Sequence, residues 1–208
     1  SNNNVAVGGV VSATYAVAIG FEALKSNTSG AKNSAIGYSS LASNTTANGN
    51  SALGYLSLKS NTTGGENTAI GASSLKTNTT GYHNVAVGRG ALKDNITGSK
   101  NVAIGTETLE DNQSSSEHTA VGYRALYNNT TGQKNTAIGY ESLKSNTTGL
   151  ENTATGYRAL LDNTTGYRNT AIGVMSSENN TTGSQNVNIG FQSLLTNVSG
   201  WGSVAIGY

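Results

Sequence analysis

A period of 17 residues is the feature of this sequence that most restricts its fold. The phrase Ala-Ile-Gly, or a close variant of it, recurs along the whole chain. Its first two glycines, Gly8 and Gly20, are 12 residues apart, and from Gly20 to Gly207 every interval is 17 residues. A stack of matching coils cannot absorb changes in loop length as a globular domain can. The uninterrupted spacing therefore predicts a single repeat array over residues 1–208, with no linker and no second domain.

Aligning the repeats on this glycine gives columns of similar residues. The position after the glycine is mostly aromatic, the third position is Ser, Ala or Thr, and the fourth is leucine except at Ser177. The seventh position is always asparagine, followed two residues later by Ser or Thr and, in most repeats, then by glycine. The asparagines of this column are Asn27, Asn44, Asn61, Asn78, Asn95, Asn112, Asn129, Asn146, Asn163, Asn180 and Asn197. A second asparagine column precedes the segment that leads to the next glycine.

The segment before each glycine predicts a short β-strand. In Asn101-Val102-Ala103-Ile104, Val102 and Ile104 share one face and Ala103 takes the other. The aromatic-x-Ser/Ala-Leu stretch is a candidate for a second strand, and Asn-Thr-Thr-Gly indicates a turn because Asn and Gly tolerate positive φ. The glycines and β-branched residues of each repeat exclude a helix. The sequence predicts an all-β fold, a parallel β-roll or β-solenoid of 17-residue coils, roughly 60 Å long at about 4.8 Å per coil.

The apolar content predicts that one chain needs a further buried surface. Hydrophobic residues make up 35% of the chain, against about 45–50% in ordinary globular domains. We expect each coil to bury one Ile and one Leu, which is a small core. The Ala column and the Ser/Ala column are suited to close approach of neighbouring chains, so they predict an oligomer packed through small-residue faces. The alternative is that these columns line the inside of a roll too narrow for larger side chains.

Composition also excludes several classes of function. The net charge of +1 offers no electrostatic basis for a nucleic-acid partner, and without cysteine there is no disulfide, thiolate zinc site or thiol nucleophile. Asp94, Asp111 and Asp162 occupy a turn column, and His83 and His118 lie near neither a repeated carboxylate nor each other. A catalytic or metal centre needs several distinct residues that converge. We therefore expect neither an enzyme nor a cofactor, and no membrane insertion of this segment.

The repeat resembles that of a known family. Asn101-Val102-Ala103-Ile104-Gly105, with the matching segments 67–71 and 84–88, is similar to the Ser-Val-Ala-Ile-Gly repeat of YadA-like heads in trimeric autotransporter adhesins. The resemblance covers essentially the whole chain, although the familiar head repeat is shorter. It implies a left-handed parallel β-roll, a side-by-side homotrimer and attachment to matrix proteins or other surfaces. Similar repeats also occur in tail-fibre and surface proteins that trimerise through a C-terminal chaperone domain.

The first asparagine column has two interpretations. Each Asn-x-Ser/Thr triplet satisfies the N-glycosylation sequon, which matters only in a host that has the transferase. The alternative is a ladder of stacked amides that hydrogen-bond to the coils above and below, and this is the interpretation that we expect. The regular threonines also suggest ice binding, but adjacent residues such as Thr45 and Thr46 point to opposite sides of a strand.

Candidate exposed contact residues come from two less regular columns. A lysine column forms a basic stripe that suits an anionic polysaccharide, and equally a solvated edge that discourages aggregation. The variable pair after each Asn-Thr-Thr-Gly turn holds aromatic and charged residues, as adhesive surfaces and unconstrained turns both do. The candidates are Lys59, Lys76, Lys93, Tyr82, His83, Tyr167, Arg168 and Trp201.

These observations predict a non-enzymatic adhesin head segment of an extracellular fibre. It would present a repetitive surface for multivalent attachment to cells, matrix or other surfaces. The alternatives are a shaft or receptor-binding segment of a phage or viral tail fibre, and a single-chain solenoid that binds ice or carbohydrate. The expected partners are further copies of the chain, together with a matrix protein, a host or prey surface, or a glycan. The expected location is the cell surface or the surface of a virion.

Overall fold

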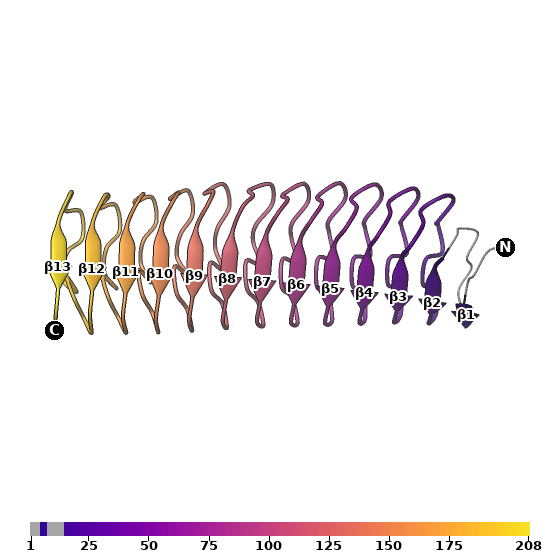
Figure 1. Ribbon diagram of the computed structural model, residues 1–208, viewed down its shortest axis with the longest axis horizontal. Coiled ribbons are helices and arrows are strands. Elements are labelled where there is room, and N and C mark those ends of the chain that lie inside the picture. The colour runs from indigo at the N-terminus through magenta and orange to yellow at the C-terminus, as the bar shows by residue number, and fades with distance from the viewer. Residues whose placement is uncertain (1–4, 8–14) are drawn as a thin grey trace.

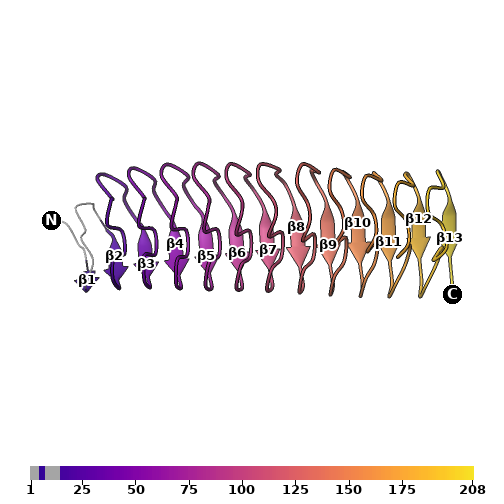
Figure 2. The ribbon, with the colours of Figure 1, turned by 180° about the vertical axis from the view of Figure 1, so that it is seen from behind.

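The protein is a rod of stacked coils, with one short strand in each coil (Figures 1 and 2). The computed structural model describes residues 5–7 and 15–208, and of residues 5–7 it describes the backbone only. The strands are β1 (Val5–Val7), β2 (Val17–Ile19), β3 (Ser34–Ile36), β4 (Ser51–Leu53), β5 (Thr68–Ile70), β6 (Val85–Val87), β7 (Val102–Ile104), β8 (Thr119–Val121), β9 (Thr136–Ile138), β10 (Thr153–Thr155), β11 (Thr170–Ile172), β12 (Val187–Ile189) and β13 (Val204–Ile206).

All of these strands belong to one parallel sheet, in which each strand pairs with the next along the chain. Val17 lies opposite Ser34 and Ala18 lies opposite Ala35, so the register advances by one whole repeat per coil. The described residues contain no helix. The predicted all-β parallel solenoid of 17-residue coils is confirmed. Gly8, the first predicted coil boundary, lies outside the described residues.

The stretch predicted as a second strand folds instead as a series of tight turns. The second and fourth residues after each strand-ending glycine have positive φ, as at Glu107 (58°) and Leu109 (52°). In this left-handed region the backbone turns back on itself rather than extending. Hydrogen bonds still join these turns from coil to coil, because the Leu41 N–H donates to the Ser57 carbonyl at 3.0 Å. The prediction of a second strand was therefore wrong.

The interior of the rod is a narrow core of leucine, alanine and small polar residues. The middle residue of each strand from β2 to β12, such as Ala103, is buried, as are most of the leucine column and the Ser/Ala column. The third strand residue faces outward, so that Ile104 is 40% exposed. The expectations that Ile fills the core and that the small columns form faces between chains were wrong. The coil encloses only enough space for one large side chain, and leucine occupies it while alanine faces it.

The two glycine columns permit close approach of successive coils. A Cβ on Gly30 would collide with the Ala47 carbonyl oxygen of the next coil and would lie 2.6 Å from Asn27 Oδ1 of its own turn. A Cβ on Gly105 would lie 2.5 Å from the Gly122 carbonyl oxygen, and Gly105 also has a φ of 136°. Positive φ was predicted for the turn glycine, and the structure places it at the strand-ending glycine instead. Within the Asn-Thr-Thr-Gly turn, glycine is required because there is no space for a Cβ atom.

Candidate binding surfaces

A ladder of asparagine side chains links successive coils inside the turns. Asn95 Nδ2 lies 2.8 Å from Asn78 Oδ1, and Asn112 Nδ2 lies 2.8 Å from Asn95 Oδ1. Asn95 Nδ2 also donates to the Gly98 carbonyl of its own turn at 3.0 Å. The same pattern runs through the column between Asn27 and Asn180, whose asparagines are all buried. Because these amides are enclosed and hydrogen-bonded, the folded rod does not present their sequons to a transferase.

The second asparagine column holds backbone groups of the neighbouring coils. Asn84 Oδ1 accepts a hydrogen bond from the Asn101 N–H at 3.0 Å, and Asn101 Nδ2 donates to the Ser115 carbonyl at 3.0 Å. His118 replaces asparagine here and is only 1% exposed. Its Nδ1 accepts the Asn135 N–H at 3.2 Å. Burial lowers the pKa of His118 to about 4, so the imidazole is neutral at neutral pH with its proton on Nε2.

The lysine column is a basic stripe over only part of its length. Lys93 Nζ lies 2.7 Å from Oε1 of Glu110, which occupies the same column one coil further on. This hydrogen bond raises the pKa of Lys93. Within the described part of the chain, Lys59 and Lys76 form no ion pair. Two of the three candidate lysines are thus outside any ion pair in the described residues.

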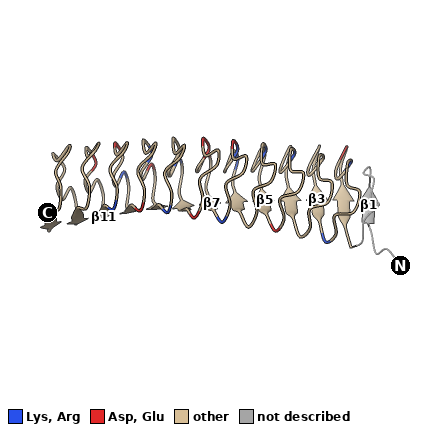
Figure 3. Ribbon diagram, turned by 90° about the horizontal axis from the view of Figure 1, so that it is seen from above, with Lys and Arg blue, Asp and Glu red and all other residues tan. Residues whose placement is uncertain are grey.

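Charges in two other columns alternate in sign from coil to coil, and they lie at the loops rather than on the strands (Figure 3). Arg124 Nε lies 2.7 Å from Glu107 Oε2, and Arg168 Nε lies 2.7 Å from Glu151 Oε2. The hydrogen bond from Arg124 lowers the pKa of Glu107. Like charges about 4.8 Å apart on neighbouring coils would repel and destabilise the stack. The alternation of sign avoids this repulsion.

Exposed aromatic rings stack in rows directly after the strands. The ring centroids of Tyr123 and Tyr140 are 5.3 Å apart, and so are those of Tyr140 and Tyr157. A second row of the same kind consists of Phe21, Tyr38 and Tyr55. Stacking turns the faces of the rings toward each other, so their edges meet the solvent.

The outward face of the sheet is uncharged along the rod. Its most exposed column, the third residue of each strand, is aliphatic except at Thr155. Eight members of this column are each a third to a half exposed: Ile19, Ile36, Leu53, Ile70, Ile104, Ile138, Ile172 and Ile189. The first residue of each strand, which shares this face, is Ser, Thr or Val. None of the strands contains a charged residue, and all of them are tan in Figure 3 apart from β1, which is grey. A single chain therefore leaves a long uncharged face in contact with water.

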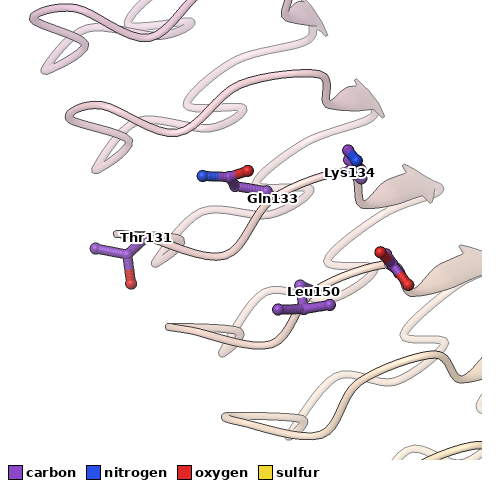
Figure 4. Close-up of a pocket in the computed structure, with 5 residues that line it drawn as sticks. Thr131, Gln133, Lys134 and Leu150 are labelled. Atoms are coloured by element: carbon purple, nitrogen blue, oxygen red, sulfur yellow. The ribbon is translucent and has the colours of Figure 1, made fainter.

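The variable turn pairs contain the least repetitive surface. Thr131, Gln133, Lys134, Leu150 and Glu151, from two consecutive coils, line a shallow depression of about 250 Å³ (Figure 4). The variability of the two columns after each turn made them candidates for a contact surface. The sequence did not predict that residues of neighbouring coils form a depression there.

The structure divides the aromatic contact candidates into two groups. Tyr167 and Trp201 meet edge to face with centroids 5.6 Å apart, and the Arg168 guanidinium lies 5.9 Å from the Tyr167 ring centre. Tyr82 and His83 form a separate edge-to-face pair several coils away, with His83 Nδ1 3.0 Å from Glu66 Oε2.

The fold defines this chain as a β-solenoid repeat protein. Comparison with protein-family models, with curated proteins and with solved structures finds no match. Over the described residues there is no group of three His, Asp or Glu side chains that could hold a metal ion. The same part of the chain has no helix of the length and apolarity needed to cross a membrane.

Proposed function

We propose that this chain is a non-enzymatic segment of an extracellular homotrimeric fibre, which presents a repetitive surface for attachment. The resemblance to YadA-like heads supports this proposal and suggests left-handed winding. The observation that carries it is the uncharged sheet face, where an isoleucine stays 40% exposed in the middle strand β7. The partner that best fits this face is a second copy of the chain, because the coils of each copy recur at the same spacing and present the same uncharged column.

Burial of this face is large enough to hold chains together. Full burial of an isoleucine is worth about 1.5–3 kcal/mol, so covering the remaining two-fifths contributes roughly 0.6–1.2 kcal/mol per coil. Summed over the coils, each chain gains on the order of 10 kcal/mol. Three chains around one axis bury the same face of every copy without leaving an open edge. The turns then face outward and repeat each contact along three sides, which favours multivalent attachment.

The turn hydroxyls do not favour the alternative of ice binding. Thr62 Oγ1 donates to the Thr79 carbonyl at 3.1 Å, and Thr147 Oγ1 donates to the Thr164 carbonyl at 3.1 Å. The first threonine of each such turn thus uses its hydroxyl within the protein. A single row of free hydroxyls is left, at the second position, where a flat ice-binding surface uses two.

Sedimentation equilibrium of the purified chain tests the proposed function. We expect a trimer at micromolar concentration, and Ile104→Asp with Ile138→Asp should shift it toward monomer. Thr80→Asp with Thr131→Asp, on the exposed turn, is the matched control and should remain trimeric. Far-ultraviolet circular dichroism shows whether the variants keep the β structure. A monomeric parent chain at these concentrations would overturn the proposal.

A further inference from the structure

We propose that the edge formed by the variable turn pairs of residues 131–201 binds a carbohydrate chain of little net charge. The aromatic pair Tyr167 and Trp201 would stack against a sugar ring, and the depression around Gln133 would bind neighbouring hydroxyl groups. This inference rests on the proposed function, because it names the class of ligand for the attachment surface.

The apolar residues of this edge gather in one part of the rod. The column that contains Leu150, Tyr167 and Trp201 holds Ala31, Asn48, Gly65, Tyr82, Ser99 and Ser116 in earlier coils, so Tyr82 is the one large side chain among those six. The fold therefore does not require large apolar side chains at this column. Trp201 is nevertheless 60% exposed. An exposed aromatic cluster that the repeat does not need points to a ligand.

The aromatic pair forms a corner held in place by the backbone. Tyr167 and Trp201 are two coils apart and meet across Ser184, whose side chain is small enough to let the two rings touch. Ser184 Oγ accepts the Tyr167 N–H at 3.1 Å, and Ser184 pairs with Trp201 through a parallel bridge. The two ring planes are perpendicular. A pyranose ring fits such a corner because its axial C–H groups pack on one ring face while its rim meets the other ring.

The polar groups beside the corner suit hydroxyl groups better than a highly charged ligand. The depression offers the Gln133 amide, the Lys134 ammonium and the Glu151 carboxylate over the apolar side chain of Leu150 (Figure 4). Glu117, Lys134, Glu151 and Arg168 follow one another in one column, and their four charges alternate in sign and sum to zero. Arg168 is neutralised by Glu151 at 2.7 Å and keeps further N–H donors. This mixture of donors and acceptors matches sugar hydroxyls, whereas an anionic polymer requires uncompensated cations.

The two parts of the edge are spaced for a short oligosaccharide. Gln133, Leu150, Tyr167, Ser184 and Trp201 follow one another in a single column, one coil apart. At about 4.8 Å per coil they span about 19 Å along the rod. A chain of several sugar rings lying parallel to the rod axis would therefore contact both the depression and the aromatic corner.

This inference is tested by measuring the binding of the full chain to an array of neutral and acidic oligosaccharides. The chain has a single tryptophan, so the fluorescence of Trp201 reports on the site directly. A bound neutral glycan should shift this emission, and its affinity should change little between low and physiological salt. Trp201→Ala and Tyr167→Ala should each weaken binding by roughly tenfold or more. Tyr82→Ala, in the same column but remote from the edge, is the matched control and should bind as the parent does.

Three results would overturn the inference. They are an absence of binding to any oligosaccharide, binding that survives Trp201→Ala, and binding restricted to highly charged glycans and abolished by salt. Failure of the proposed function is distinguishable, because it is read from sedimentation. A trimer that binds no glycan contradicts this site alone, and a monomer that binds glycan through Trp201 contradicts the trimer alone.

Discussion

Protonation of His118 should loosen the middle of the rod as the pH falls. In the native state Nδ1 of His118 accepts the Asn135 N–H, and Nε2 lies 3.2 Å from Asn129 Nδ2. The Gly132 carbonyl also faces the ring. None of these neighbours is ionisable, so nothing nearby compensates a positive charge. A protonated imidazole has no acceptor, which leaves the Asn135 N–H without its partner.

The size of the effect follows from the pKa of His118, which is about 4 in the folded rod against the ordinary 6.5. Since the folded state disfavours the proton, the contribution is fully present above pH 6.5 and is lost progressively as the pH falls toward 4. The 2.5-unit difference corresponds to about 3 kcal/mol in total. At pH 5 the loss should already reach about 2 kcal/mol.

Urea unfolding at a series of pH values checks this prediction. His118→Asn restores the asparagine of the column and serves as the reference, because the carboxylates of both proteins titrate alike. The free energy of unfolding of the parent, relative to His118→Asn, should fall by about 2 kcal/mol between pH 7.5 and pH 5. The same difference at both pH values would refute the reasoning.

Other perturbations test the ladder, the close approaches and the core, with urea unfolding as the common measurement. Asn95→Ala leaves several buried polar groups without partners and should cost about 3–5 kcal/mol, whereas the exposed change Thr80→Ala should stay within about 0.5 kcal/mol. Gly105→Ala combines positive φ with a backbone clash and should cost at least about 3 kcal/mol. Gly65→Ala should cost much less, because its Cβ would meet only the Asn48 backbone, with O at 3.1 Å and N at 3.9 Å. Leu92→Ala empties the one large core position of its coil and should cost about 2–5 kcal/mol. A parent-like unfolding transition for Asn95→Ala, Gly105→Ala or Leu92→Ala would contradict the contact assigned to that residue.

The sequence predicted the coil length, the strand and the parallel stacking because each depends on periodicity. It did not predict which face of the strand turns inward. Val102 and Ile104 lie on the same face of the strand, whichever face turns inward. The general preference for burying large side chains predicts that this face belongs to the core. The narrow coil reverses the assignment, so Ala103 is inside. That outcome depends on the width of the roll, which cannot be predicted from the pattern of residues within one strand.

The tight turns after each strand could not be predicted from the sequence for a related reason. Leucine is not a residue that favours positive φ, yet Leu109 adopts it because the stacked coils hold its side chain in the core. Local propensity therefore suggested a strand where tertiary packing imposes a turn. The depression at Gln133 and Leu150 could not be predicted from the sequence, because its lining residues come from two coils that are 17 residues apart in sequence.

The direction of the hydrogen bonds between coils has a mechanical consequence. The strands lie across the rod, so these bonds run along its length (Figure 1). Tension applied to the two ends therefore acts on every coil in series, and the coils should detach one at a time. Each detached coil releases 17 residues, which extend to about 58 Å in place of the roughly 4.8 Å that the coil occupied. A pulled fibre of such coils would lengthen in equal steps of about 53 Å, and each step would absorb part of a sudden load before it reached the attachment surface.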